Sequence, residues 1–190
     1  MERAGFEDEH FDKIDFSEKA PVKGDYDHCT FVSCNFSGAD LSDISFVECE
    51  FIGCNLGMAK LMKTAMKDVK FRDCKLLGLH FEQCSEFLFE VDFDNCLLNL
   101  ASFYKLKLKK MRFKQCSLQE ADFSEADLTA AIFDDCDLAG ATFDQTILEK
   151  ADFRTAYNYT LDPAGNRIKK AKFAMPGVIG LLAKYDIEIK

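Results

Sequence analysis

The chain carries a large apolar residue at almost every fifth position. The series runs from Phe6, Phe11 and Phe16 to Phe153 with few exceptions. A period of five matches neither the α-helix, which repeats every 3.6 residues, nor the β-strand, which repeats every two. A fixed period of this kind indicates a repeat architecture, in which successive copies of one short unit stack on each other.

A second position of the repeat, two residues before each large one, is small. It holds cysteine or alanine in most copies, as in Cys34-Asn35-Phe36 and Ala126-Asp127-Leu128. The residue between the two is usually polar, and the two residues after the large one are mostly polar. We therefore expect two side chains of every five to point inward and three to point outward.

A longer period of twenty residues lies within the short one. Phe51 and Phe71 are twenty residues apart, and so are Phe93 and Phe113. Twenty residues are four repeats, which predicts a coil with four corners per turn that stacks like residues on like. Phe71 and Phe93 are 22 residues apart. This difference predicts a two-residue insertion at one corner, within 82–87, that leaves the columns intact.

These repeats resemble the pentapeptide-repeat family, whose pattern is A-(D/N)-L-x-x. The stretches 34–41 and 121–128 match the pattern closely. The resemblance implies an all-β solenoid, a right-handed quadrilateral β-helix, here over about residues 1–173. The last coil, 158–167, departs from the pattern, because Asn158 and Pro163 stand where large apolar residues are expected. The repeat is specific for fold and says little about function.

The five-residue period stops before residues 174–190. Pro176 suits the first turn of a helix, and an apolar stripe follows it. Asp186 to Ile189 alternate like a short strand. We expect a C-terminal helix and strand that cap the open end of the β-helix, join two chains, or do both. The candidate dimer seam consists of Val178, Ile179, Leu181, Leu182, Tyr185, Ile187 and Ile189.

Charge is distributed unevenly along the chain, whose formal net charge is −9. Residues 1–50 hold thirteen acids and four bases, and 51–118 hold seven acids and twelve bases. Residues 119–153 then hold ten acids and one base, and 154–190 hold three acids and seven bases. The charge thus alternates in four stripes, acidic, basic, acidic and basic.

Several functional classes have little support in the sequence. Eight of the nine cysteines occupy the small inward position, which predicts buried free thiols rather than disulfides or metal ligands. Neither a metal site nor a cofactor is expected, and no arrangement of nucleophile, base and orienting residue suggests an enzyme. The chain has no apolar run long enough for a membrane span and no signal pattern at its start, so a cytoplasmic protein is expected.

The C-terminal segment narrows the resemblance. Residues 168–173, the Leu181-Leu182 pair and residues 186–189 are similar to the end of pentapeptide-repeat proteins that act on DNA gyrase, namely the albicidin-resistance, microcin-immunity and Qnr types. The resemblance implies a homodimer that engages DNA gyrase or topoisomerase IV and confers resistance or immunity to a gyrase poison. The chain lacks the two projecting loops of Qnr proteins of Gram-negative origin.

The acidic stripe at 119–153 suggests how such binding would occur. A rod with outward carboxylates on successive turns resembles duplex DNA, which carries a regular row of negative charge. We therefore expect a DNA mimic that does not itself bind nucleic acid. The alternative is a general protein-interaction scaffold that uses the basic band at 51–118. The candidate acidic surface consists of Glu120, Asp122, Glu125, Asp127, Asp134, Asp135, Asp137, Asp144, Glu149 and Asp152.

Overall fold

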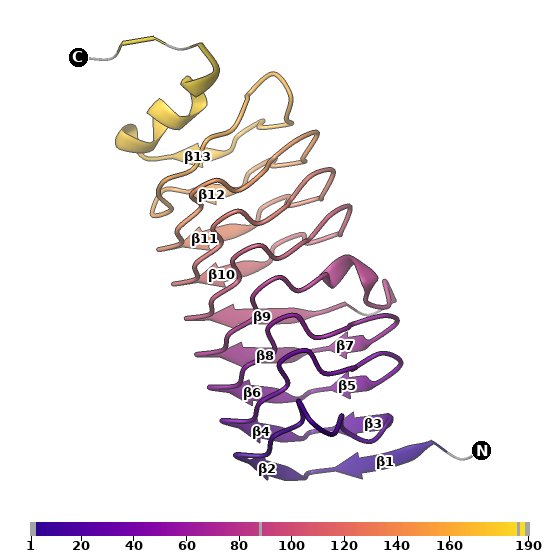
Figure 1. Cartoon of the computed structure of the whole chain (residues 1–190). Helices are drawn as coiled ribbons and strands as arrows, with labels where there is room; N and C mark the ends of the chain where they lie inside the picture. The colour runs from indigo at the N-terminus through magenta and orange to yellow at the C-terminus, as the bar shows by residue number, and fades with distance from the viewer. Residues whose placement is uncertain (1–2, 88, 186, 189–190) are drawn as a thin grey trace.

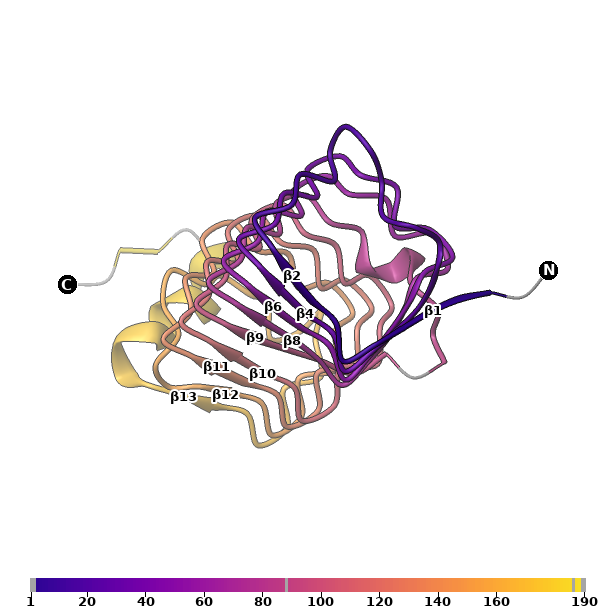
Figure 2. The same cartoon turned by 90° about the horizontal axis from the view of Figure 1, so that it is seen from below.

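The chain folds into a single straight coil of stacked turns, as a computed structural model shows (Figure 1). The structure describes residues 3–87, 89–185 and 187–188. The N-terminus and the C-terminus lie at opposite ends of the rod. Viewed along the rod, the turns enclose a four-sided interior (Figure 2). The predicted β-solenoid is thereby confirmed.

All strands are short and pair in parallel with the turn before and the turn after. Most pairs are offset by twenty residues, as in Phe31↔Phe51 and Phe113↔Phe133. The strands are β1 (Ala4–Glu7), β2 (His10–Asp12), β3 (Gly24–Asp27), β4 (Thr30–Val32), β5 (Ser45–Val47), β6 (Glu50–Ile52), β7 (Ala65–Lys67), β8 (Val69–Arg72), β9 (Val91–Asp94), β10 (Arg112–Lys114), β11 (Ile132–Asp134), β12 (Asp152–Phe153) and β13 (Lys172–Phe173). The described residues also form three 3-10 helices: η1 (Phe81–Gln83), η2 (Met175–Leu181) and η3 (Ala183–Tyr185).

The four faces of the rod are numbered here in the order in which the chain reaches them. Face 1 holds the sheet β1-β3-β5-β7. Toward the C-terminus, isolated β-bridges from Lys107 to Arg167 continue this face. Face 2 holds the nine-stranded sheet from β2 to β13. Face 3 is a series of single bridges from Asp15 to Tyr157, and face 4 includes the bridges from His80 to Thr142.

The core is a set of columns that run along the rod. On face 2 the rings of Phe31, Phe51 and Phe71 stack with centroids 4.7 and 5.0 Å apart. Edge-to-face contacts link this column to its neighbours, as between Phe113 and Phe123. The small position lets the chain turn the corner. All nine cysteines are buried free thiols, and the Cys54 and Cys74 thiols donate to backbone carbonyls of the preceding turn.

The corners require a special backbone conformation. The second residue after each large one has a positive φ in most turns, for example 51° at Gln115 and 52° at Asp135. Glycine fills this position at Gly38 and Gly140, and most other corners carry polar or charged residues. Glycine adopts this conformation readily, whereas other residues keep it only where their neighbours hold them in place. The corner side chains consequently point outward, and several candidate site residues lie there.

The predicted insertion appears as a change of pairing distance between β8 and β9. Phe71 pairs with Phe93, 22 residues away, whereas the pairs before and after are twenty apart. The N–H of Ser85 still donates to Thr64, and that of Glu90 donates to Met66, so the extra residues lie between these two. Leu88, where the sequence predicts the pattern to resume, lies outside the described residues. Phe89 packs half-buried against the core.

The last coil differs from the prediction in its details. Asn158 and Pro163, at the expected large positions, do not fill the core; Tyr159 and Leu161 do so instead, with 4% and 5% exposure. The C-terminal helix is present as η2 and η3. The expected strand at 186–189 is absent at Ile187 and Glu188, and Asp186 and Ile189 lie outside the described residues.

Tyr159 explains why two glycines stand in η2. A Cβ built on Gly180 would lie 2.0 Å from the Tyr159 carbonyl oxygen, and one on Gly177 would lie 2.0 Å from the Tyr159 hydroxyl. The N–H of Leu161 also donates to the Gly180 carbonyl, at 3.2 Å. The glycines weaken the helix by themselves, but they let it dock tightly on the last turn.

Candidate functional site

The repeat distributes the ten predicted acidic residues over all four faces of the rod. Each is exposed or half-buried and none is buried, as the five-residue pattern predicts. They do not form one continuous strip. Asp127 and Glu149 lie on face 1, Asp134 and Asp152 on face 2, Asp137 on face 3, and Asp122 and Asp144 on face 4. Glu120, Glu125 and Asp135 lie at corners and have positive φ values.

Half of these acids form ion pairs with bases on neighbouring turns. Glu149 accepts from Arg167 at 2.6 Å, and Asp127 lies 3.2 Å from the Lys109 amine. Arg112 pairs with Asp134, and this contact is the main cause of the lowered pKa of Asp134. Glu125, Asp127, Asp134, Glu149 and Asp152 are called the paired acids below.

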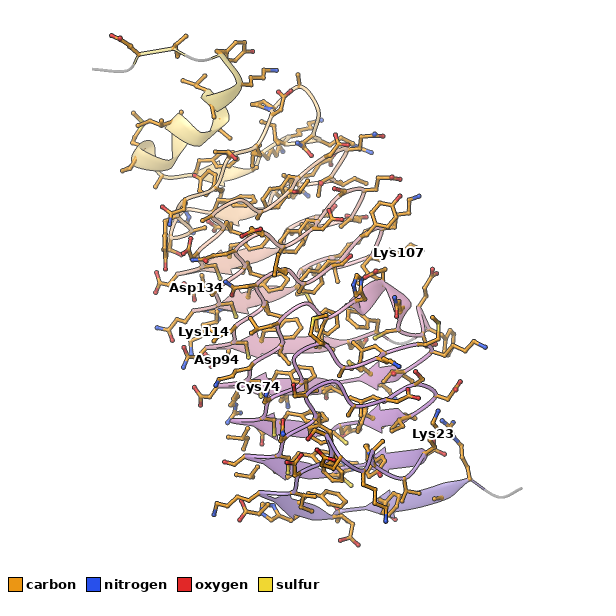
Figure 3. All side chains as sticks on the ribbon, viewed as in Figure 1. Lys23, Cys74, Asp94, Lys107, Lys114 and Asp134 are labelled. Atoms are coloured by element: carbon orange, nitrogen blue, oxygen red, sulfur yellow. The ribbon has the colours of Figure 1, made fainter. Side chains whose placement is uncertain are left out.

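Face 2 shows this pairing most clearly. Asp152 binds Arg154 at 2.8 Å and lies 3.7 Å from the Lys172 amine. Lower on the same face, Lys114 binds Asp94 at 2.9 Å. Figure 3 shows Asp94, Lys114 and Asp134 above one another along the rod, while Cys74 lies in the interior. The sign of the charge thus alternates from turn to turn, and face 2 is close to neutral.

The other five acids have no ion-pair partner in the part of the chain that the structure describes. They belong to faces 3 and 4 and to the corners beside them. Glu120, Asp135 and Asp144 are exposed, and Asp122 and Asp137 are half-buried. Glu120, Asp122, Asp135, Asp137 and Asp144 are called the unpaired acids below.

Hydrogen bonds hold two of the unpaired acids in place. The Asp137 carboxylate accepts from Gln119 at 2.7 Å and from Asn158 at 2.8 Å. Burial alone would raise the pKa of Asp137, but these hydrogen bonds outweigh it and lower the pKa overall. Asp122 accepts from the Ser124 N–H at 2.9 Å. Both carboxylates are therefore held in fixed positions by hydrogen bonds.

The spacing of acids and bases along the sequence could have revealed these ion pairs, whereas their numbers alone could not. The ion-paired residues are separated by about one turn, as in Lys105 and Glu125, twenty residues apart, or Arg112 and Asp134, 22 apart. An acid and a base at such a spacing meet on adjacent turns of one face. The basic band of 51–118 thus supplies several of the partners that neutralise the acidic stripe.

The candidate dimer seam lies at the far end of the rod. Ile179, Tyr185 and Ile187 are 54%, 59% and 56% exposed. Val178 and Leu182 are half-buried, Leu181 packs against the core, and Ile189 lies outside the described residues. The structure therefore places the described seam residues on one segment, η2 to residue 187, and leaves several of them exposed.

Other kinds of site find no support in the described part of the chain. No helix there is long and apolar enough to cross a membrane. No group of three or more acidic, histidine or cysteine side chains converges there in a way that would hold a metal ion.

Comparison with known proteins identifies the fold family. No curated protein matches the chain. Its structure is similar to a trypsin-treated form of QnrB1, a plasmid-mediated fluoroquinolone resistance protein, with 22% identity, a TM-score of 0.47 and coverage of 99% of this chain and 98% of the other. It is also similar to HetL, a pentapeptide repeat protein involved in heterocyst differentiation regulation in Nostoc sp. strain PCC 7120, with 16% identity, a TM-score of 0.34 and coverage of 91% and 85%.

The family assignment depends on the sequence match. The model of the pentapeptide repeat region matches residues 24–86 and 86–157, which together make up more than half of the chain. These residues include the columns of phenylalanine, leucine, cysteine and alanine that fill the core. The chain therefore belongs to the pentapeptide-repeat family.

Proposed function

We propose that this protein binds DNA gyrase or a related type II topoisomerase by imitating duplex DNA, and that it thereby confers resistance or immunity to a gyrase poison. The resemblance of residues 168–189 to gyrase-acting proteins suggests the partner. The main structural support is the set of unpaired acids on faces 3 and 4 and the corners beside them. Fixed carboxylates without basic partners present a negative surface to a DNA-binding cleft.

The spacing of the turns suits this role. Stacked rings on face 2 lie 5.2 Å apart between Phe113 and Phe133 and 4.8 Å apart between Phe133 and Phe153. Outward residues on successive turns repeat at a similar distance. Each strand of duplex DNA carries one negative charge per roughly 3.4 Å of axis. The outward positions of the rod therefore repeat at a spacing comparable to, though longer than, that of DNA phosphates. The unpaired acids occupy different positions on neighbouring turns, since Asp122 pairs with Thr142 and Asp137 with Tyr157.

Dimerisation would extend this surface. The unpaired acids lie on the two turns that precede the one with Tyr159, on which the C-terminal segment docks. The apolar side chains Ile179, Tyr185 and Ile187 of that segment are exposed. If two chains joined through these side chains, their acidic surfaces would lie near the centre of a longer rod. A homodimer is thus part of the proposal, with the cytoplasm, where gyrase acts, as its location.

A second candidate function is a general protein-interaction scaffold. The paired acids favour it, because nearby bases neutralise Asp134 and Asp152 on face 2. A DNA mimic would be expected to leave such carboxylates without basic partners. In that case the contacts would be made by the basic band, and a topoisomerase would not be the partner.

A supercoiling assay tests the proposed function directly. Purified protein is titrated into DNA gyrase with relaxed plasmid, with and without a gyrase poison. We expect a change in supercoiling or in poison-induced cleavage at micromolar protein, together with direct binding by biolayer interferometry. No binding and no change in either assay up to high micromolar protein would contradict the proposal and leave the scaffold as the better account.

A further inference from the structure

An apolar patch lies midway along the rod, beginning one turn below the unpaired acid Glu120 and away from the C-terminal end. It occupies successive turns of face 3 and the adjoining part of face 4. The exposed fractions are 68% for Met58, 50% for Met62, 38% for Leu77, 43% for Leu97 and 60% for Leu100. These five residues are called the apolar patch below.

The backbone ladder makes this patch one continuous surface. The N–H of Met58 donates to the Leu77 carbonyl at 2.9 Å, and Lys75 pairs with Leu97 on the next turn. A Cβ built on Gly78 would lie 2.5 Å from the Met58 sulfur, so the Met58 side chain lies across Gly78. The small glycine thus lets the methionine cover the surface between two turns.

The repeat itself does not require apolar residues here. The position that holds Met58 and Leu100 in their turns holds Gly38 one turn earlier and Glu120 one turn later. The position of Leu97 is filled by Asn55 two turns earlier and by Ser117 one turn later. The core needs only the inward residues, so these outward apolar side chains are a local property of this chain. Contiguous exposed apolar surface of this kind marks an interaction site.

Three lysines border the patch. Lys60, Lys63 and Lys75 are exposed, and none has a carboxylate within 4.0 Å among the described residues. Lys105 and Lys109, higher on the rod, are by contrast paired with Glu125 and Asp127. Lys60 faces Asp40 on the preceding turn without forming an ion pair with it, and no carboxylate in the described part of the chain lies close to Lys63 or Lys75. The lysines beside the patch are therefore available to an external anion.

We propose that the apolar patch with Lys60, Lys63 and Lys75 is a docking surface for an acidic amphipathic segment of a partner protein. Apolar side chains of the segment would cover the leucines and methionines, and its carboxylates would meet the lysines. Methionine suits such a surface, because its unbranched side chain adapts to different partners. This second contact surface adjoins the unpaired acids at Leu100 and Glu120 but consists of other residues, and it does not depend on the proposed function.

A second copy of this chain is a poorer occupant. Its own patch carries the same lysines, so two patches would repel each other. The C-terminal segment of a second copy carries both signs of charge, with Lys184 paired to Asp162 and with Asp186 and Glu188 beside Ile187 in the sequence. Charge complementarity therefore favours an acidic partner segment over a second patch, and sedimentation distinguishes the C-terminal segment of a second copy.

Fluorescence anisotropy with synthetic peptides tests this inference on the full-length protein. The probe is an 18-residue labelled peptide with leucine at helical spacing on one face and glutamate elsewhere. A peptide of the same leucine pattern with lysine in place of glutamate serves as its charge control. The patch variant carries Met58→Ser and Leu100→Ser, and the lysine variant carries Lys60→Gln, Lys63→Gln and Lys75→Gln. Ile132→Ser, an exposed apolar residue on face 2, is the matched control.

We expect the acidic peptide to bind the wild type and the Ile132→Ser protein equally, and the lysine peptide to bind neither. The patch variant should weaken binding at least about tenfold, and the lysine variant should weaken it and flatten its salt dependence. Circular dichroism and thermal unfolding confirm that each variant is folded. Equal binding of both peptides, no binding of the acidic one, or unchanged binding to the folded patch variant would overturn the proposal. Sedimentation tests the remaining alternative. The proposal would also be overturned if no peptide bound, the wild type self-associated and the patch variant did not.

Discussion

At the scale of single residues, the fold depends on what each repeat places inside. Phe113 is fully buried and stacks on Phe93 and Phe133, with ring centroids 5.7 and 5.2 Å away. It also meets Phe103 and Phe123 edge to face. A side chain with rings above, below and beside it cannot be removed without leaving a cavity that the rigid turns do not fill.

The first prediction follows from this column. Phe113→Ala should lower the free energy of unfolding by about 3–5 kcal/mol, because it removes buried apolar area and leaves a cavity. Urea denaturation followed by circular dichroism measures the change. Ile132→Ala, an exposed change on the same face, should stay within about 0.5 kcal/mol of wild type. If Phe113→Ala costs under about 1 kcal/mol, the column does not stabilise the rod as argued.

The second prediction concerns buried thiols. Burial raises the pKa of Cys49 and of Cys84 to about 12, whereas an unfolded cysteine ionises near 8.5. Above about pH 9 the unfolded state therefore holds fewer protons than the folded one, and stability falls as pH rises. A thiol reagent at pH 8 should label few cysteines in the native protein and all nine after denaturation.

Comparison of two proteins isolates this pH effect. Between pH 8 and about pH 10 the wild type should lose more unfolding free energy than a variant with Cys49→Ala and Cys84→Ala, because the variant lacks two of the groups that ionise only on unfolding. Equal losses in the two proteins, or rapid labelling of these cysteines in the native state, would show that their thiols are not buried as described.

At the scale of elements, regular positions could be predicted and irregular ones could not. The sequence predicts the inward columns and the offset of 22 residues at one corner because each rests on exact repetition. It does not predict that Tyr159 replaces Asn158 in the core, since that exchange depends on how η2 docks on the last turn. The acids could be predicted to face outward, but their division into paired and unpaired sets depends on contacts between turns.

The third prediction concerns the docking of η2. Gly180→Ala should loosen the C-terminal segment and speed trypsin cleavage after Lys184, because the new Cβ would meet the Tyr159 carbonyl oxygen. Gly165→Ala is the matched control, since its Cβ would have neighbours only at 3.9 Å, an ordinary contact. Mass spectrometry of a digestion time course measures the rate. Equal cleavage of the two variants would contradict the tight docking on Tyr159.

The fourth prediction concerns assembly through the same element. Leu182→Glu should convert the proposed dimer into monomers in light scattering, because a carboxylate would be buried at the apolar seam. The rod should remain folded by circular dichroism, since Leu182 lies outside the core columns and is only half-buried. Glu188→Gln is a control on the same segment that should leave the mass unchanged. A wild type that is monomeric at high micromolar concentration would rule out both the seam and the longer rod.

At the scale of the whole molecule, the rod separates its charges by face. Ion pairs, most of them between turns, neutralise the paired acids of faces 1 and 2, whereas the unpaired acids of faces 3 and 4 have no basic partner among the described residues. The total charge of −9 alone would not show this difference. Because exposed ion pairs stabilise a fold little, the two sets differ more in the field that they present to a partner than in their effect on stability.

The fifth prediction uses this separation to test DNA mimicry. One variant neutralises the unpaired acids, and a second neutralises the paired acids, each by five Asp→Asn or Glu→Gln changes. Both raise the net charge by the same amount, so bulk charge cannot explain a difference between them. If the protein imitates DNA with faces 3 and 4, the first variant should bind gyrase roughly tenfold more weakly, a loss of about 1.4 kcal/mol, with a shallower salt dependence. The second should bind within about threefold of wild type, because its carboxylates already have basic partners. Binding is measured by biolayer interferometry at several salt concentrations.

Suppose instead that both acidic variants bind like wild type while Lys109→Glu with Lys110→Glu abolishes binding. The basic band would then be the contact surface, and the scaffold function would replace DNA mimicry.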